Sequence, residues 1–371
     1  MSASGAADPL ALGQRVVAVL ETGARTATYK LATLMALVDH CVEHLPRDPH
    51  ARLVVPLPDL AHRVIEIYWH QVRPFEGAMR LRQSTQPVAR ILRAVEHLRD
   101  TSGAAHTGLA LEIARNRAPD AYASAREEVL LTLVQQPLHR LQKLPGATSS
   151  SPFLYDDSWM HDQVSRRTIR QHEDAITLYP DVAYGLARLS GLLKPTLEIL
   201  WVEDVRRMNR FLDEQVPDVA GHLFGRERID LGPARYALRE AFGPTCFYCE
   251  TSLPPSNPVD HLLPWSRLGL DGLANLVLAC GRCNSSKVHS LPALQHVDRA
   301  LARERSTLED IASSLLWPTQ YERVVSAARG LYLGEPTGTP TWQGVGNTLV
   351  LDLASYSPWW IEYDGGHHLP G

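Results

Sequence analysis

The spacing of apolar residues predicts helices through the first 145 positions. Over residues 26–45 the apolar side chains stand three or four positions apart, the period of one helix face: Leu31, Leu34, Met35, Val38 and Cys41. The same spacing predicts three further helices, over residues 57–72, 87–100 and 120–144. We therefore expect residues 1–145 to form an all-helical region.

Shorter alternating pieces follow a linker-like run, PGATSSSP, at residues 145–152. Alternation of apolar and polar residues predicts two or three short strands in these pieces, FLYDDSW, QVSRRTIR and AITLYP. An earlier piece, RLVVPLP at residues 52–58, is typical of a strand or an extended link. A helix is predicted from Asp181, a candidate N-cap, and Pro195 is expected to kink or divide it. Residues 146–215 are thus predicted as short strands plus a helix.

The last third of the chain returns to helical patterns. They recur in three stretches, the last of which is divided near Pro318: residues 227–243, 284–305 and 308–332. The final residues contain Gly, Pro and Trp without clear periodicity. We expect one domain over residues 216–305 and a C-terminal extension over residues 306–371 that packs on it. The predicted fold class is mainly α with small β, that is, α+β.

Length, charge and hydropathy narrow the classes of function. At 371 residues the chain is long enough for two or three domains. The net charge of −4 excludes a protein that is basic throughout, so any contact with nucleic acid must come from local patches. No apolar run reaches the roughly 18 residues of a bilayer span, and the N-terminus lacks the features of a signal peptide. We expect a cytoplasmic protein that does not associate with membranes.

Parts of the chain are locally basic. Seven arginines accompany three acidic residues between Arg63 and Arg99, with Tyr68 and Trp69 nearby. Two further groups of arginines follow: Arg166, Arg167 and Arg170, then Arg206, Arg207 and Arg210. Such patches are typical of contact with a nucleic-acid backbone. The alternative is a solvated helix face above core aromatic residues, and the sequence leaves both open.

Four of the five cysteines form two CxxC pairs: Cys246 with Cys249, and Cys280 with Cys283. Two such pairs are typical of knuckles that close one tetrahedral zinc site. A site of four thiolates has no open position, so its zinc ion would be structural. The 30 residues between the pairs exceed the usual gap of about 15–20, which indicates an insertion between the knuckles. The alternative of two redox-active pairs requires a thioredoxin-like βαβ pattern, which is absent from the sequence.

The insertion carries the residue types that phosphodiester hydrolysis requires, namely a base and ligands for a cation. His261 is the candidate base, because imidazole titrates near neutral pH. Asp260 points to the other side of a strand, where its carboxylate suits Mg²⁺ or Mn²⁺. Asn284 opens the helix that follows Cys283, and its amide oxygen would complete the protein ligands of that ion.

The motif order CxxC, DHxxPxS and NLxxxCxxCNxxK resembles the HNH (ββα-metal) endonuclease family of the zinc-stapled, four-cysteine type. The resemblance implies a ββα unit and a DNA substrate. It also implies hydrolysis by a histidine-activated water, with products that carry 5′-phosphate and 3′-hydroxyl ends. It also implies that Asn275 orients His261 through its side chain or backbone. One departure is the loop SRLGLDGLAN, where members of the family often have Gly-Gly.

A looser likeness rests on few residues, the segment DHLLPWSRLGLDGLANLVLACGRCNSSK and the opening TYKLATLMAL. By these residues the chain resembles a wider group. It is similar to bacterial HNH proteins with a helical N-terminal region, for which roles in restriction or anti-phage defence are suspected. In that interpretation residues 1–145 sense the target, residues 146–215 contact DNA, and residues 216–305 are the nuclease domain. The candidate DNA-binding residues are Lys287, Arg282, Arg267, Arg166, Arg167 and Arg170.

Two other functions compete with a constitutive DNA endonuclease. The four-cysteine unit would serve equally as a non-catalytic zinc module that binds DNA or docks a protein. That interpretation does not explain why Asp260, His261, Asn275 and Asn284 occur together at these positions. The second competitor is an effector nuclease that a ligand activates. A homodimer and a partner protein of a defence system are both left open, because the sequence does not decide between them.

Overall fold

The computed structural model describes residues 9–22, 25–75, 79–86, 88–104, 109–143, 152–213, 218–225 and 230–363. The chain divides into two compact units. The first comprises Met1–Cys41 and Pro46–Ile229, and the second comprises Val42–Leu45 and Asp230–Gly371. Helices dominate both units and each sheet has two strands, which confirms the predicted fold class of mainly α with small β.

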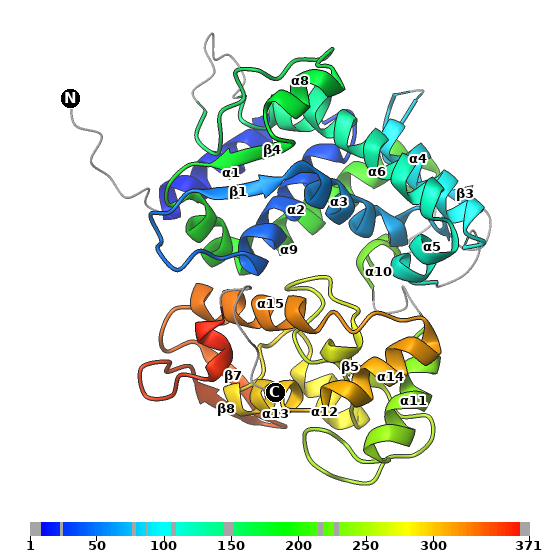
Figure 1. Ribbon diagram of the computed structural model, residues 1–371, viewed down its shortest axis with the longest axis vertical. Helices are drawn as coiled ribbons and strands as arrows, with labels where there is room; N and C mark the ends of the chain where they lie inside the picture. Colours follow the sequence, from blue (N-terminus) through cyan, green and yellow to red (C-terminus); the bar gives the residue numbers. More distant parts are fainter. Residues whose placement is uncertain are drawn as a thin grey trace. The chain divides into compact units, whose positions relative to one another are not determined.

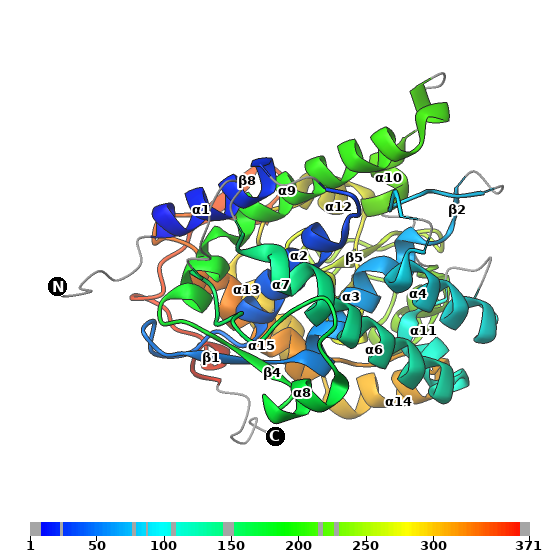
Figure 2. The ribbon, with the colours of Figure 1, turned by 90° about the horizontal axis from the view of Figure 1, so that it is seen from above.

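The first unit is built on long helices with an aromatic core. Its helices, which Figure 1 labels except for α7, are α1 (Pro9–Thr22), α2 (Tyr29–Glu43), α3 (Leu57–Gln71), α4 (Arg90–Thr101), α5 (Leu111–Arg117), α6 (Pro119–Leu133), α7 (His139–Leu141), α8 (Arg166–Gln171), α9 (Val182–Met208) and α10 (Val219–Phe224). Helices α3, α4 and α6 pack on one another, and α1 lies alongside α9 (Figure 2). Tyr68, Trp69 and Trp201 are fully buried among them.

Two small antiparallel sheets accompany these helices. Strand β1 (Leu53–Pro56) pairs with β4 (Ala175–Leu178), and β2 (Pro74–Phe75) pairs with β3 (Met79–Arg80). The strand predicted in AITLYP is therefore confirmed, and RLVVPLP, typical of a strand or an extended link, contains β1. Because β1, β2 and β3 all lie within residues 1–145, the expectation of an all-helical region there is wrong. The strands predicted in QVSRRTIR and FLYDDSW are wrong, because residues 166–170 belong to α8 and FLYDDSW contributes an isolated bridge between Tyr155 and Leu178 instead of a strand. The hydroxyl oxygen of Ser165 accepts a hydrogen bond from the backbone N–H of Thr168 and caps that helix.

Proline has less effect on the helices than the sequence suggested. Helix α9 runs through Pro195 without a break, so the predicted division there is wrong. Pro137 lies in a π-helical turn, Val134–Leu138, that joins α6 to α7. Asp181 precedes α9, but its carboxylate pairs with Nδ1 of His50 at 2.6 Å instead of capping the helix. No helix in the ranges given above is long and apolar enough to cross a membrane.

The second unit contains a ββα element. Strands β5 (Val259–His261) and β6 (Leu276–Leu278) are antiparallel, and α12 (Gly281–Lys287) follows β6 directly. Its other elements are the helices α11 (Gly232–Phe242), α13 (Leu294–Leu301), α14 (Arg305–Leu315) and α15 (Tyr321–Gly334), the 3₁₀ turns Leu273–Asn275 and Trp359–Glu362, and the strands β7 (Pro340–Gly344) and β8 (Asn347–Val350). The helix division predicted near Pro318 is confirmed, since α14 and α15 end and begin on either side of it.

The β7–β8 hairpin has no clear signal in the sequence because every residue of β8 is exposed, so no alternation of buried and exposed positions marks it. Trp342 of β7 nevertheless fixes the hairpin to the ββα element, since its indole Nε1 donates to Ser286 Oγ of α12 at 3.0 Å. Residues 42–45 pack on α15, where the Val42 carbonyl oxygen leaves no room for a side chain at Gly330. The four-part domain division stays a prediction, and its linker-like run lies largely outside the described residues.

Candidate functional site

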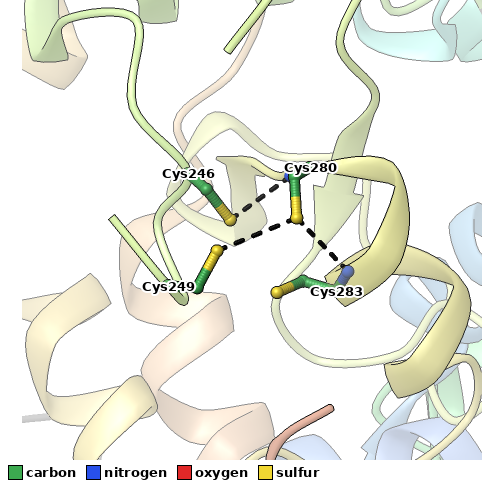
Figure 3. Close-up of side chains that lie close together, drawn as sticks. All are labelled: Cys246, Cys249, Cys280 and Cys283. Carbon is green, nitrogen blue, oxygen red and sulfur yellow. Dashed lines mark hydrogen bonds between the residues drawn. The ribbon is translucent and has the colours of Figure 1, made fainter. Parts of the chain in front are cut away.

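The four cysteines converge from two separate knuckles. Cys246 and Cys249 lie in a tight turn in which Glu250 has a positive φ of 59° and its N–H donates to the Cys246 carbonyl. Cys280 and Cys283 lie at the beginning of α12. Figure 3 shows the side chains of both pairs pointing toward one another, and all four sulfur atoms lie within 4.8 Å of each other.

The sulfur spacing fits a tetrahedral zinc ion. Zn–S bonds of about 2.3 Å place neighbouring sulfur atoms about 3.8 Å apart in a tetrahedron. The Sγ atoms of Cys249 and Cys280 are 3.8 Å apart. Two backbone N–H groups also point at sulfur, from Cys280 to Cys246 Sγ at 3.3 Å and from Cys283 to Cys280 Sγ at 3.4 Å. Such donors stabilise thiolate ligands, so the four cysteines form a candidate structural zinc site.

The thiols differ in their surroundings. The hydroxyl of Thr251 lies 3.2 Å from Cys249 Sγ, and this hydrogen bond is the main cause that lowers the pKa of Cys249 to about 6. Burial raises the pKa of both Cys246 and Cys283. Zinc holds all of its cysteine ligands as thiolates, so the buried pair in particular is stabilised in that form by a bound ion.

His261 ends β5 and pairs with a carboxylate that the sequence analysis did not select. Its Nε2 atom lies 2.8 Å from Oδ1 of Asp271, and the two side chains are 12% and 19% exposed. Both are therefore partly shielded while remaining open to a ligand. Asp271 belongs to LGLDGL, the loop in which this chain departs from the Gly-Gly pattern, and that departure was its one sequence signal.

Residues after α14 fix the position of Asp271. The backbone N–H groups of Leu273 and Ala274 donate to the carbonyls of Pro318 and Thr319, each at 3.0 Å. A side chain at Gly272 would meet the Thr319 carbonyl oxygen at 2.6 Å, so this close approach requires glycine. The Trp317 indole also donates to the Asp271 carbonyl at 2.7 Å. The partner of the candidate base is thus held by a segment more than forty residues later in the chain.

Asn275 is fully buried and ties the loop between β5 and β6 together. Its Oδ1 atom accepts from the Leu263 N–H at 2.8 Å, and its Nδ2 atom donates to the carbonyls of Leu263 and Leu270 at 3.1 and 3.0 Å. Its own backbone carbonyl accepts from the Leu262 N–H, next to His261. These contacts set the shape of the loop that bears Asp271, and a direct role for Asn275 in orienting His261 stays a prediction.

The side chain of Asp260 lies on the opposite side of β5 from that of His261, and one of its carboxylate oxygens contacts two neighbouring side chains. Its Oδ2 atom accepts from the Tyr248 hydroxyl at 2.7 Å and lies 3.1 Å from Lys287 Nζ. The Lys287 ammonium also donates to the His261 carbonyl at 2.7 Å, and the lysine side chain is completely buried. The prediction that Lys287 contacts DNA therefore lacks support, because its charge is directed into the protein, where it anchors Asp260 and β5.

The second oxygen of Asp260, Oδ1, accepts no hydrogen bond within the described ranges. Asn284 lies on α12 one turn before Lys287, on the same face of the helix, and is half-buried. A carboxylate oxygen and an amide oxygen are the donors that a hard divalent cation such as Mg²⁺ prefers. The residues present therefore fit the predicted magnesium ligands, Asp260 through Oδ1 and Asn284 through its amide oxygen.

The predicted DNA-binding arginines fall into two groups. Some are held in ion pairs: Arg166 with Glu127 and Asp174, Arg267 with Glu335 at 2.9 Å, and Arg63 with Glu66 at 2.8 Å. Others are exposed, namely Arg167 and Arg170 on α8 and Arg282 on α12. Ion pairing neutralises part of the positive charge that the sequence predicted for DNA contact. The exposed arginines are therefore the better candidates for binding DNA.

One basic cavity was not predicted as a unit. Its volume is about 400 Å³, and its lining residues come from two distant segments: Arg82, Ser84, Thr85, Arg207, Met208, Asn209 and Arg210. Asn209 holds the segments together, since it accepts from the Arg82 N–H at 2.8 Å and donates to the Arg82 carbonyl at 2.7 Å. The sequence showed Arg207 and Arg210 as a basic helix end, but only the fold adds Arg82.

Comparison with known proteins finds two families in the chain. A family described as HNH endonuclease matches residues 246–290, which confirms the resemblance drawn from the cysteine, DH and NxxK motifs. A second family, described as Domain of unknown function (DUF8808), matches residues 10–221, more than half of the chain. No curated protein and no solved structure matches.

Proposed function

We propose that this chain, which belongs to the family described as Domain of unknown function (DUF8808) and carries an HNH endonuclease domain, is a metal-dependent DNA endonuclease. The observation that carries the proposal is the pairing of His261 with Asp271 at the end of β5. An isolated zinc module needs no histidine that is hydrogen-bonded to a carboxylate. It also needs no second carboxylate, such as Asp260, with one oxygen available to a metal ion. A hydrolase needs both.

The reaction begins with the base. The N–H at Nε2 of His261 donates a hydrogen bond to Asp271, and Nδ1 of the imidazole takes a proton from water. The water oxygen attacks phosphorus in line with the departing 3′ oxygen, and the expected products carry 5′-phosphate and 3′-hydroxyl ends. Asp260 and Asn284 would hold Mg²⁺ or Mn²⁺, which supplies positive charge for the developing negative charge on the leaving oxygen.

The zinc site supports this chemistry without taking part in it. Cys280 and Cys283 begin the helix that carries Asn284 and Lys287, while Cys246 and Cys249 belong to the first knuckle. A zinc ion bound by all four would fix the start of α12 relative to the strand with Asp260 and His261. Loss of zinc would therefore disorganise the active site rather than remove a reacting group.

Contact with DNA is assigned to exposed arginines. The cavity lined by Arg82, Arg207 and Arg210 has the charge and hydrogen-bonding groups for a phosphate of the DNA backbone. Arg207 already donates to Asp204, so Arg82 and Arg210 are the main candidates. Arg167, Arg170 and Arg282 are additional positions. Such contacts bring the substrate to the protein but do not read its sequence.

A non-catalytic zinc module remains the second candidate, and one observation favours it. The Lys287 ammonium lies beside Asp260, where it neutralises a carboxylate that an active nuclease needs for its metal ion. In this alternative the chain binds DNA or a protein, and His261 and Asp271 only stabilise the loop. An effector nuclease that requires a ligand is a variant of the main proposal, as is a role in restriction or anti-phage defence.

The test is cleavage of plasmid DNA by the purified full-length protein in Mg²⁺ or Mn²⁺, beside His261→Ala. We expect nicking or cutting by the wild-type protein and none by the variant, with the same zinc content in both. Equal cleavage by both proteins would contradict the role of His261. Binding of DNA without cleavage, on unmodified and modified substrates alike, would instead favour the non-catalytic module.

A further inference from the structure

A second group of metal-binding side chains lies in the first unit, away from the cysteines in sequence. His62 and Glu66 are one turn apart on α3, and Glu112 comes from α5. One ligand atom from each lies within 4.8 Å of the other two. The Nε2 atom of His62 is 3.4 Å from Glu66 Oε1 and 3.6 Å from Glu112 Oε1. We call these residues the His62 cluster.

Each member of the His62 cluster is held from outside by another side chain. The Tyr122 hydroxyl lies 2.8 Å from His62 Nδ1. Arg63 donates to Glu66 Oε2 at 2.8 Å, and Arg115 donates to Glu112 Oε2 at 3.3 Å. The outer oxygen of each glutamate is therefore anchored, and the inner oxygen faces the histidine. This is the usual arrangement around metal ligands, whose second atoms are oriented by hydrogen bonds.

The spacing of the inner atoms is close to that of ligand atoms around a zinc ion. An N–H···O hydrogen bond spans about 2.7–3.2 Å, which is shorter than both distances from His62 Nε2. A tetrahedral zinc ion with bonds of about 2.0–2.1 Å separates its ligand atoms by about 3.3–3.4 Å. Octahedral Mg²⁺ at about 2.1 Å would draw neighbouring oxygens to about 3.0 Å. The same reasoning reproduces the sulfur spacing of the four-cysteine site.

We propose that His62, Glu66 and Glu112 bind a divalent transition-metal ion, in the first place Zn²⁺, in addition to the zinc of the four cysteines. One nitrogen and two carboxylate oxygens are acceptable zinc ligands, and the side chains are about one-fifth exposed, so an ion can enter. Three protein ligands leave a fourth position for water or for an anionic group of a bound molecule. The ion would also join α3 to α5.

The alternative is a purely electrostatic triad in which a protonated His62 lies between two carboxylates. Burial alone lowers the pKa of His62, but Glu66 and Glu112 together raise it above its ordinary value. The triad and the metal site use the same atoms, so they exclude each other at any moment. Measurement of bound metal therefore separates them.

The experiment is elemental analysis of the full-length protein after equilibration with Zn²⁺ and removal of loosely bound ions. We expect two zinc ions per chain in the wild-type protein and one in His62→Gln. His97→Gln provides the matched control, since His97 is an exposed histidine of α4 in the same unit, and it should retain two. One zinc ion per chain in the wild-type protein, or two in His62→Gln, would overturn the proposal.

A second variant and a spectroscopic readout guard against misfolding of His62→Gln. Glu112→Gln keeps the size of the side chain on α5, and it should also lose one ion. Co²⁺ replaces zinc and gives intense thiolate-to-cobalt absorption only at the four cysteines. We expect both variants to retain that absorption and to lose only the weaker bands of the second site. Spectra identical to those of the wild-type protein would exclude the site.

Discussion

Two histidines in this protein meet carboxylates in different ways. His261 lies 2.8 Å from one oxygen of Asp271, a hydrogen-bond distance. His62 lies 3.4 and 3.6 Å from oxygens of Glu66 and Glu112, longer than the usual N–H···O distance of about 2.7–3.2 Å. The short contact orients an imidazole and fixes which nitrogen carries the proton. The longer spacing leaves room for an ion between the groups, so distance alone indicates different chemistry for similar residues.

The two sites share one feature that sharpens the comparison. At both, a carboxylate is anchored through one oxygen by a protein cation, Asp260 by Lys287 and Glu66 by Arg63. The other oxygen of each carboxylate does not contact that cation. A buried lysine beside Asp260 therefore does not exclude a metal ion there, because it occupies Oδ2 and leaves Oδ1.

The largest effect is expected from Lys287→Met, which removes the buried partner of Asp260. Loss of one member of a buried ion pair leaves an uncompensated charge and costs about 3–5 kcal/mol. We expect the free energy of unfolding of the second unit to fall by about that amount, as measured by urea denaturation. The double variant with Asp260→Asn should be destabilised less than Lys287→Met alone. If both are destabilised equally, Lys287 acts by packing and not by charge.

The next effect concerns Asp271→Asn, which keeps the shape of the side chain but removes the charge that orients His261. General-base catalysis contributes about 10²–10⁴-fold, so we expect kcat for DNA cleavage to fall by at least about 10²-fold. KM, zinc content and DNA affinity should stay close to the wild-type values, because the role assigned to Asp271 is to orient the base.

Asp310→Asn is the matched control for Asp271→Asn, since Asp310 is an exposed aspartate of α14 in the same unit. It should leave kcat unchanged. A loss of zinc or of thermal stability in Asp271→Asn would mean that the residue supports the loop and has no separate effect on the base. An unchanged kcat would remove Asp271 from the mechanism and leave Asn275 as the candidate for positioning His261.

The sequence predicted the parts of the candidate site that lie within one short segment. Zinc knuckles and a ββα unit impose fixed local spacings, so the sequence alone identifies the segment from Cys246 to Cys283 and the Asp260–His261 pair within it. Asp271 was not selected, because its place depends on Pro318 and Thr319, which the sequence separates from it by almost fifty residues. The N-terminal helices were predicted from periodicity, but periodicity does not show which helices cross.

The same limit explains the His62 cluster. Its two residues on α3 are one turn apart and visible in the sequence, whereas Glu112 joins them only because α5 packs beside α3. Arg63 was assigned to a basic surface, yet the fold uses it to hold Glu66. Composition and spacing therefore identify charged residues, and only the crossing of helices decides whether they face solvent or one another.

A smaller, pH-dependent effect should distinguish the two states of the His62 cluster. The pKa of His62 is raised above its ordinary value, so in zinc-free protein the protonated histidine contributes stability at low pH that is lost as pH rises through that pKa. With zinc at the cluster the sign reverses, because the ion requires neutral imidazole and is released as pH falls. The difference in melting temperature between the wild-type protein and His62→Gln, measured from pH 5 to 8, should therefore change in opposite directions with and without added Zn²⁺, because the four-cysteine site is the same in both proteins. Parallel curves would contradict metal binding there.

The smallest effect is expected at the basic cavity, where Arg82→Ala removes one candidate phosphate contact. Loss of one contact reduces the slope of log affinity against log salt by about one, and weakens binding by a similar factor for all DNA sequences. Fluorescence anisotropy with labelled duplexes at several salt concentrations measures both quantities. Arg188→Ala is the control, since Arg188 is an exposed arginine of α9, the helix that carries Arg207.

The result for Arg82 also bears on the comparison of the two histidine sites. Arginines that hold carboxylates, such as Arg63 and Arg115, contribute no net charge to a DNA-binding surface, whereas Arg82 adds its full charge to the cavity. A reduced salt slope in Arg82→Ala but not in Arg63→Ala would show that ion pairing decides which arginines are available to DNA. If Arg82→Ala, Arg63→Ala and Arg188→Ala all gave the same salt slope, DNA contact would lie outside the cavity. Arg167, Arg170 and Arg282 would then be the next candidates.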